Sequence, residues 1–172
     1  SFREIKENEL LVKVMATSII PADCFNLQGS YGNETPQLPA VFGMEGSGII
    51  EKVGENVDKK LIGKHCGIVI RPSKENYHGV WAEYCYATVQ SLVIFDKQLD
   101  FTKIFSTFVN PMTICGFLDV IKKSGLKSVA QNGASSALGR MFIKLCNKEG
   151  IEVINIVRKE STIEELKLIG GK

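Results

Sequence analysis

Short runs of apolar residues, many of them β-branched, recur through the first part of the chain. Four of them span residues 9–17, 46–54, 63–70 and 79–88. Turn-forming glycine, proline and asparagine residues separate these runs, and this combination is typical of short β-strands. Up to about residue 106 the pattern therefore predicts a β-barrel or a strongly bent antiparallel sheet.

The period of the apolar residues then changes. Between Ser136 and Gly150 they recur with helical i, i+3, i+4, i+7 spacing, and the glycine is a stop signal. Residues 151–157, IEVINIV, are an almost uninterrupted apolar run, as expected for a parallel strand covered on both faces. Ser161 and Glu164 match a capping box that would begin another helix. This β-α-β-α order predicts parallel strands and the beginning of a doubly wound nucleotide-binding sheet.

The segment SVAQNGASSALGR, residues 128–140, joins the first of these strands to its helix. In such a unit, backbone N–H groups and the positive end of the helix dipole converge on the loop, which suits a phosphate. Gly133 permits a tight turn and Gly139 a close helix–strand approach, but Ala137 replaces the middle glycine of the G-x-G-x-x-G motif. The segment alone leaves open whether it binds a cofactor or is a plain strand-to-helix loop.

About twenty residues after the turn, where dinucleotide-binding units contact the ribose, the chain has Arg158 followed by Lys159. Enzymes that use NAD place Asp or Glu at this point, whereas an Arg accommodates the 2′-phosphate of NADP. A guanidinium suits a phosphate in geometry and charge, and a carboxylate would repel it. A solvated basic residue at the end of a strand is the other interpretation. The turn and the arginine together favour NADPH binding.

Composition and charge indicate a globular protein that binds a small molecule or another protein. The 172 residues are 44% hydrophobic and 23% charged, and Lys and Arg exceed Asp and Glu by 21 to 19. The charges are mixed along the chain, so there is no electrostatic case for nucleic acid or an anionic membrane. No apolar run approaches the roughly 18 residues of a membrane helix, so we expect no membrane insertion. The five cysteines are scattered without a Cys-x-x-Cys pair, which predicts small buried hydrophobic residues.

Five motifs follow one another along the chain: VKVMATSIIPAD (12–23), LQGSYG…LPAVFGMEGSG (27–48), GVWAEY (79–84), VNPMT (109–113), and AQNGASSALGR together with INIVRKE (154–160). In this order they resemble the medium-chain dehydrogenase/reductase superfamily, and within it zinc-free quinone oxidoreductases and 2-enoyl thioester reductases. The last motif is especially similar to mitochondrial enoyl reductases and their bacterial relatives.

The resemblance covers nearly the whole chain and implies an α/β protein with a β-barrel. Residues 1–106 would form a GroES-like substrate and catalytic domain that lacks its first strand and its C-terminal return. Residues 107–172 would form a partial Rossmann NADPH-binding domain, the first half of a doubly wound sheet. The implied activity is an NADPH-dependent reduction of an enoyl thioester or a quinone.

The resemblance also implies functional residues. Tyr31 matches the tyrosine that in enoyl reductases donates a proton or orients the substrate while NADPH gives hydride to the β-carbon; packing of a turn is the alternative. Asn110 and Thr113 lie where the family brings a helix beside the nicotinamide, and helix capping explains them equally well. The remaining cofactor-binding residues would be Asn132, Gly133, Ala134, Ser135, Ser136, Ala137, Leu138, Gly139 and Arg158.

Zinc is not expected. Ile20, Met44 and approximately Val109 stand where zinc-dependent members of the family place ligands. None of these side chains can ligate the metal, and the chain has no counterpart of the cysteine-rich structural zinc lobe.

The chain is shorter than the family pattern, and a parallel sheet of two strands cannot cover itself. Three interpretations stay open. The chain is part of a longer enzyme, one piece of a split protein, or a truncated inactive relative that serves as a structural or NADPH-binding subunit of a larger complex. A homodimer is also expected from the family. The enoyl reductase likeness points to mitochondria, and the quinone reductase likeness to the cytosol.

Overall fold

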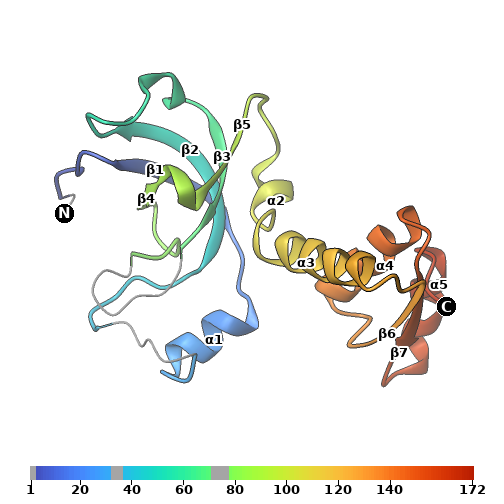
Figure 1. The fold of residues 1–172 in the computed structure, drawn as a ribbon. Coiled ribbons are helices and arrows are strands. Elements are labelled where there is room, and N and C mark those ends of the chain that lie inside the picture. Colours follow the sequence, from blue (N-terminus) through green and yellow to red (C-terminus); the bar gives the residue numbers. More distant parts are fainter. Residues whose placement is uncertain (1–2, 32–36, 71–77) are drawn as a thin grey trace. The chain divides into compact units, whose positions relative to one another are not determined.

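The structure is a computed structural model that describes residues 3–31, 37–70 and 78–172 (Figure 1). Contacts divide the chain into two compact units, Ser1–Phe108 and Val109–Lys172. The division falls close to residue 106, where the hydrophobic pattern changes.

The first unit is built on a five-stranded sheet in the order β4-β1-β2-β3-β5, with every neighbouring pair antiparallel. The expected bent antiparallel sheet is confirmed, because the pairing of β1 with β2 shifts register twice and such irregularities bend a strand. Its strands are β1 (Glu9–Thr17), β2 (Glu45–Val53), β3 (His65–Val69), β4 (Tyr84–Thr88) and β5 (Leu92–Phe95). Its helices are α1 (Pro21–Leu27), η1 (Lys59–Leu61), η2 (Val89–Ser91) and α2 (Phe101–Ile104).

The run at residues 79–88 was predicted as one strand, but only its second half is a strand. The backbone N–H groups of Gly79 and Trp81 donate instead to the carbonyls of Val41 and Phe42, at 2.7 and 2.8 Å. These bonds hold the chain against another loop rather than in the sheet. Trp81 still packs against the hydrophobic core, as expected, and its Nε1 donates to the Ser18 carbonyl at 3.0 Å.

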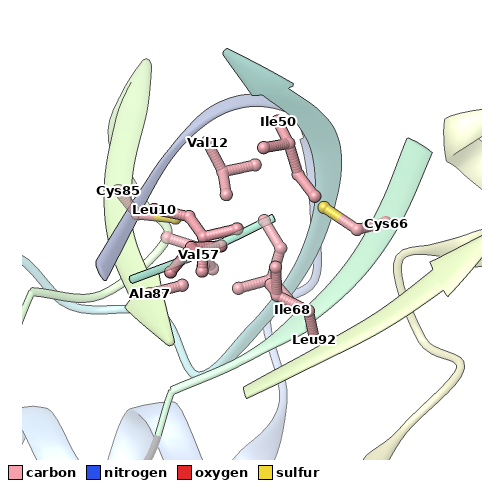
Figure 2. Close-up of a cluster of buried hydrophobic side chains, with 10 residues drawn as sticks. Leu10, Val12, Ile50, Val57, Cys66, Ile68, Cys85, Ala87 and Leu92 are labelled. Atoms are coloured by element: carbon pink, nitrogen blue, oxygen red, sulfur yellow. The ribbon is translucent and has the colours of Figure 1, made fainter. Parts of the chain in front are cut away.

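The core of this unit collects apolar side chains from all five strands (Figure 2). Leu10, Val12, Ile50 and Ile68 are completely buried. Each such side chain contributes about 1.5–3 kcal/mol relative to an exposed one, so they are a main source of this unit's stability.

The cysteines follow the prediction only in part. Three of them, Cys66, Cys85 and Cys146, are buried among apolar side chains. Cys24 and Cys115 are exposed, because each lies on a helix, α1 or α3, in which only two positions are buried. Burial was therefore the wrong expectation for these two thiols.

Two buried polar side chains of β2 fix the segment that leaves the first unit. Glu45 Oε1 accepts the Phe108 N–H at 2.9 Å, and Ser47 Oγ donates to the Phe101 carbonyl at 2.9 Å. Both side chains are at most 1% exposed, and buried polar groups of this kind are stable only when hydrogen-bonded.

The second unit has the predicted β-α-β-α order and a parallel pair of strands. β6 (Ser128–Asn132) and β7 (Glu152–Ile156) pair in register along their whole length. α4 (Ala137–Lys148) connects them. The remaining elements are α3 (Val109–Lys123), η3 (Glu160–Thr162) and α5 (Ile163–Leu168).

Only one face of this two-stranded sheet is covered among the described residues. Val153 is 4% exposed and packs in a cluster with Ile143 of α4, Ile121 of α3 and Leu166 of α5. Ile154 and Ile156 are more than half exposed. The expectation that β7 is covered on both faces is therefore not met within this part of the chain.

The predicted capping box at the last helix is wrong. A 3₁₀ turn, Glu160–Thr162, precedes α5, and the helix begins after Thr162 rather than after Ser161. The Thr162 hydroxyl donates to the Lys159 carbonyl at 2.8 Å, so it stabilises the turn instead of accepting a helix N–H.

The prediction that no stretch approaches membrane-span length is also wrong. Residues Phe101–Lys123 form a helical stretch that is long and apolar enough to cross a membrane, judged by length and composition alone. Scattered polar residues interrupt its apolar run without making the stretch polar. It consists of α2, a turn and α3, and α3 alone has 15 residues, against about 20 for a span. We interpret the stretch as the connection between the two units.

Candidate cofactor site

A cleft of about 640 Å³ opens in the second unit where β6 and β7 end. Such crevices at the carboxyl ends of parallel strands are where ligands bind in open α/β sheets. One wall is the turn after β6, with Asn132, Gly133, Ser135 and Ser136. The other wall follows β7, with Ile156, Val157, Arg158, Lys159 and Thr162. The glycine turn and the arginine, which are distant in sequence, thus line the same cleft.

The turn itself is tight and is tied to the helix that follows. Gly133 has φ 63°, a left-handed conformation that favours glycine, and its carbonyl accepts the Ser136 N–H at 2.9 Å. Ser136 is the N-cap of α4, and its hydroxyl accepts the Gly139 N–H at 3.1 Å. A Cβ at Gly139 would lie 2.7 Å from the carbonyl oxygens of residues 133 and 134. Only glycine allows this close approach.

The electrostatics of the cleft favour an anion. The first turn of α4 brings the positive end of its dipole to one wall. Arg158 and Lys159 are exposed on the other wall, and within the described ranges neither is paired with a carboxylate. Two acids of α5 are paired with other cations, Glu164 with Lys167 and Glu165 with Arg140.

Arg140 connects the two sides of the cleft. Its Nε donates to the Ser135 carbonyl at 3.0 Å, and its Nη2 donates to the Glu165 carboxylate on α5. The turn after β6 is therefore held to the helix that follows the second wall. The pair is partly exposed, so its contribution to stability is small, but it restricts how far the turn can move.

The predicted cofactor residues fall into three groups. Asn132, Gly133, Ser135, Ser136 and Arg158 line the cleft. Four others shape the turn without lining it: Ala134 and Gly139 are buried, Ala137 is exposed at the helix start, and Leu138 packs against the core of this unit. The last two, Asn110 and Thr113, do not line the cleft.

Asn110 and Thr113 lie on the first turns of α3. The Thr113 hydroxyl donates to the Val109 carbonyl at 2.7 Å, a bond within the helix itself. This bond is not a helix cap, because the hydroxyl donates to a carbonyl instead of accepting a helix N–H. Contact with a cofactor stays a prediction for both residues.

Sequence reasoning did not select Thr162, which lines the second wall. It lies four positions after Arg158, in the 3₁₀ turn that is present instead of the predicted capping box. A hydroxyl in a strand-to-helix connection was the available signal, but only the turn geometry brings it to the cleft.

Tyr31 belongs to the first unit, where it is 38% exposed. It follows α1, and the Asp23 carboxylate fixes that helix by accepting the N–H groups of Ile20 and Met44, both at 2.9 Å. The loop that continues after Tyr31, residues 32–36, lies outside the described part of the chain. Its proposed role in catalysis stays a prediction.

The residues at the zinc positions of related enzymes have structural roles here. Ile20 is the N-cap of α1, Met44 is 6% exposed in the first unit, and Val109 begins α3. Among the residues that the structure describes, no group of three or more His, Cys, Asp or Glu side chains could hold a metal ion.

Comparison with known proteins gives a consistent result. The Alcohol dehydrogenase GroES-like domain matches residues 6–97. The mitochondrial enoyl-[acyl-carrier-protein] reductase of Caenorhabditis elegans is 36% identical over 160 residues, which are 92% of this chain and 45% of that protein. That of Arabidopsis thaliana is 34% identical over 173 residues, 98% of this chain and 44% of the relative.

Solved structures resemble the chain over the same extent. A protein from Mesorhizobium loti described as a candidate NADPH:quinone reductase has a TM-score of 0.87 and 29% identity, covering 98% of this chain and 48% of its own. The chain therefore belongs to the medium-chain dehydrogenase/reductase superfamily, in the branch of quinone oxidoreductases and 2-enoyl thioester reductases. It spans about half the length of the curated relatives that it matches.

Proposed function

We propose that the protein to which this chain belongs is an NADPH-dependent reductase of an activated alkene, most similar in function to 2-enoyl thioester reductases. The observation that carries the proposal is the cleft of the second unit, in which Arg158 and Lys159 share a space with the turn before α4. The relatives named above are enoyl reductases and a candidate NADPH:quinone reductase, which supports the same class of reaction.

The cleft suits the adenosine end of NADPH in chemistry and size. Its volume, about 640 Å³, lies within the range of roughly 300–1,000 Å³ that is usual for small-molecule sites. Arg158 and Lys159 would bind the 2′-phosphate, Arg158 through a bidentate guanidinium contact. The turn at Gly133 to Ser136 would bind the pyrophosphate at the start of α4. When bound, NADPH supplies the hydride that reduces the β-carbon of the alkene.

Tyr31 would complete the reduction. Its hydroxyl would hydrogen-bond the enolate that develops as the alkene is reduced, or protonate its α-carbon. A phenol is a weak acid, but a single hydrogen bond in a dry site stabilises a developing oxyanion by about 3–4 kcal/mol. The partly exposed position of the side chain leaves it accessible to a small molecule.

Titration of the intact protein with NADPH and NADH tests the cofactor assignment. We expect NADPH to bind more tightly, and Arg158→Ala to weaken NADPH binding by about tenfold or more, because a charge-assisted contact is lost. NADH affinity should change little. Lys144→Ala is the control, since Lys144 is an exposed cation on α4 that does not line the cleft. Equal affinity of the unmodified protein for the two cofactors would reject the role of Arg158.

Tyr31→Phe tests the catalytic assignment, because it removes only the hydroxyl. With a crotonyl thioester and NADPH we expect kcat to fall about tenfold or more while NADPH affinity is retained. A quinone assayed in parallel distinguishes the two substrate classes, since reduction of a quinone alone would favour the quinone oxidoreductase alternative. An unchanged kcat for the thioester would reject Tyr31 as the proton donor.

A structural or NADPH-binding subunit of a larger complex is the second candidate, and a dimer with another copy is a related possibility. The exposed apolar face of the β6–β7 sheet favours it, because such a face requires cover from elsewhere. Mass spectrometry of the natural polypeptide separates the candidates: a mass near twice 19.0 kDa supports the complete reductase, and a mass near 19.0 kDa supports the subunit. Because the named relatives include mitochondrial enzymes, we propose mitochondria as the compartment, to be checked by fractionation.

A further inference from the structure

Two amide side chains face each other on the covered side of the β6–β7 sheet. Gln131 and Asn155 are directly opposite in the parallel register, and Gln131 Nε2 donates to Asn155 Oδ1 at 2.7 Å. The same nitrogen donates to the Gly139 carbonyl of α4 at 3.2 Å. The pair therefore bonds both strands to the first turn of the helix that covers them.

The pair has further bonds and apolar surroundings. Asn155 Nδ2 donates to the carbonyls of Val153 and Lys172, at 3.0 and 3.2 Å. The neighbouring positions on this face, Val129 and Val153, are apolar and pack in the hydrophobic cluster of the unit. Partly buried polar groups gain little net stability over apolar side chains of similar shape. Stability alone therefore does not explain two amides at this position.

What the amides add is a fixed geometry. Gly139 is the residue whose N–H the Ser136 hydroxyl caps, and Ser136 lines the cleft. A continuous chain of hydrogen bonds thus runs from Asn155 through Gln131 and Gly139 to Ser136. Asn155 itself lies three residues before Arg158, on the strand that leads to the opposite wall. The chain of bonds therefore connects Ser136, on one wall of the cleft, with Asn155, on the strand that leads to the other wall.

We propose that Gln131 and Asn155 are positioning residues of the dinucleotide site. They hold the start of α4 and the end of β7 at the separation that a pyrophosphate and a 2′-phosphate on one ligand require. This inference rests on the proposed NADPH-binding function. It predicts that the pair matters for ligands that contact both walls at once, and little for ligands that contact one wall.

The test replaces the amides by apolar side chains of similar shape in the intact protein, with Gln131→Met and Asn155→Leu combined. We expect the affinity for NADPH to fall about tenfold or more, because displaced binding groups lose much of their contact energy. Adenosine 2′-monophosphate, which has no pyrophosphate, should bind within about twofold of its original affinity, since additivity holds for groups that do not interact. The midpoint of thermal unfolding should be unchanged or higher.

A swapped pair, Gln131→Asn with Asn155→Gln, is the rescue variant. It keeps a hydrogen bond between two side-chain amides across the strands, and the combined length of the two side chains is unchanged. Recovery of NADPH affinity in this variant supports the positioning role. The proposal is overturned if the apolar pair binds NADPH as well as the unmodified protein, or if both ligands weaken equally together with the unfolding midpoint. Failure of the unmodified protein to bind NADPH would instead reject the proposed function on which the inference rests.

Discussion

At the scale of single residues, the buried thiols differ sharply from the exposed ones. Desolvation by burial raises the pKa of Cys66 to about 12 and that of Cys85 to about 12. Both remain protonated in the folded protein at neutral pH, and a protonated thiol is a poor nucleophile. The folded pKa of each thiol lies above the unfolded value of 9.0, so the folded state holds these protons more tightly than the unfolded state. The free energy of unfolding is therefore unaffected by these thiols below pH 9.0 and falls as the pH rises from 9.0 toward about 12.

An alkylation experiment checks this contrast. At pH 8, iodoacetamide should modify the exposed Cys24 and Cys115 and leave Cys66, Cys85 and Cys146 unmodified. In guanidinium chloride all five cysteines should react, which is the control for reagent access. Peptide mass spectrometry locates the modified residues. Rapid modification of Cys66 or Cys85 under native conditions would show that the first unit opens locally.

Asn26 is the other unusual residue. Its side chain is 2% exposed, and neither amide atom has a hydrogen-bond partner within the described part of the chain. A buried unsatisfied amide costs about 1–3 kcal/mol, so Asn26→Leu, with the same branched shape, should raise the free energy of unfolding by a similar amount. Urea titration measures this, with Asn26→Asp as the opposite change that should lower it. A less stable leucine variant would mean that the amide has a partner outside residues 3–31, 37–70 and 78–172.

At the scale of elements, the close approach of α4 to the turn before it is the most constrained contact of the candidate site. Gly139→Ala would place a Cβ 2.7 Å from two backbone carbonyl oxygens that cannot rotate away. We expect it to lower the free energy of unfolding by about 1–3 kcal/mol, as overpacking does, and to weaken NADPH binding. The same substitution at Gly116 on α3, where a Cβ meets open space, should instead raise stability by about 0.5–1 kcal/mol.

Chemical denaturation of the two variants side by side makes the comparison, because both change glycine to alanine within a helix. A Gly139→Ala protein as stable as the Gly116→Ala protein would contradict the packing assigned to the start of α4. Loss of stability without loss of NADPH affinity would show that the turn keeps its shape when the helix moves.

The sequence predicted well those elements in which the order of apolar and polar residues follows the burial of the side chains. β1 alternates and carries a block of apolar residues, and the helical period of α4 is clear, so both were identified. β5 was missed because its four residues are too few to show a period. The polar Asn155 inside an apolar run had no visible purpose in the sequence. Its role depends on Gln131, a partner that only the parallel register brings opposite.

Some residues of the candidate site could likewise be predicted from the sequence, and others could not. The turn and Arg158 could be predicted, because the spacing along a β-α-β unit decides where both lie. Thr162 could not, because a 3₁₀ turn rather than a capping box precedes α5. Tyr31 came from resemblance alone, and its loop continues into residues outside the described ranges.

At the scale of the whole molecule, the second unit presents an apolar surface that needs cover. Ile154 and Ile156 are 54% and 58% exposed on adjacent outward positions of β7. An apolar groove of about 710 Å³ adjoins β6 and is lined in part by Phe117 and Val120 of α3. Surfaces of this kind are interaction sites or cause aggregation, and unpaired strand edges add to the tendency.

The 172-residue chain should therefore associate with itself as its concentration rises, and Ile154→Lys with Ile156→Lys should reduce that association. Sedimentation velocity measures it, and Leu168→Lys is the control, because Leu168 is 88% exposed on α5. If the double lysine variant associates as strongly as the unmodified chain, the exposed face of the β6–β7 sheet does not mediate the association. The same double substitution in the natural polypeptide then identifies what covers the face. A charge is tolerated on this sheet face only where the face stays in water. If the unfolding midpoint falls and the mass does not change, another part of the same chain covers the face. If a partner is released, a partner in a complex covers the face.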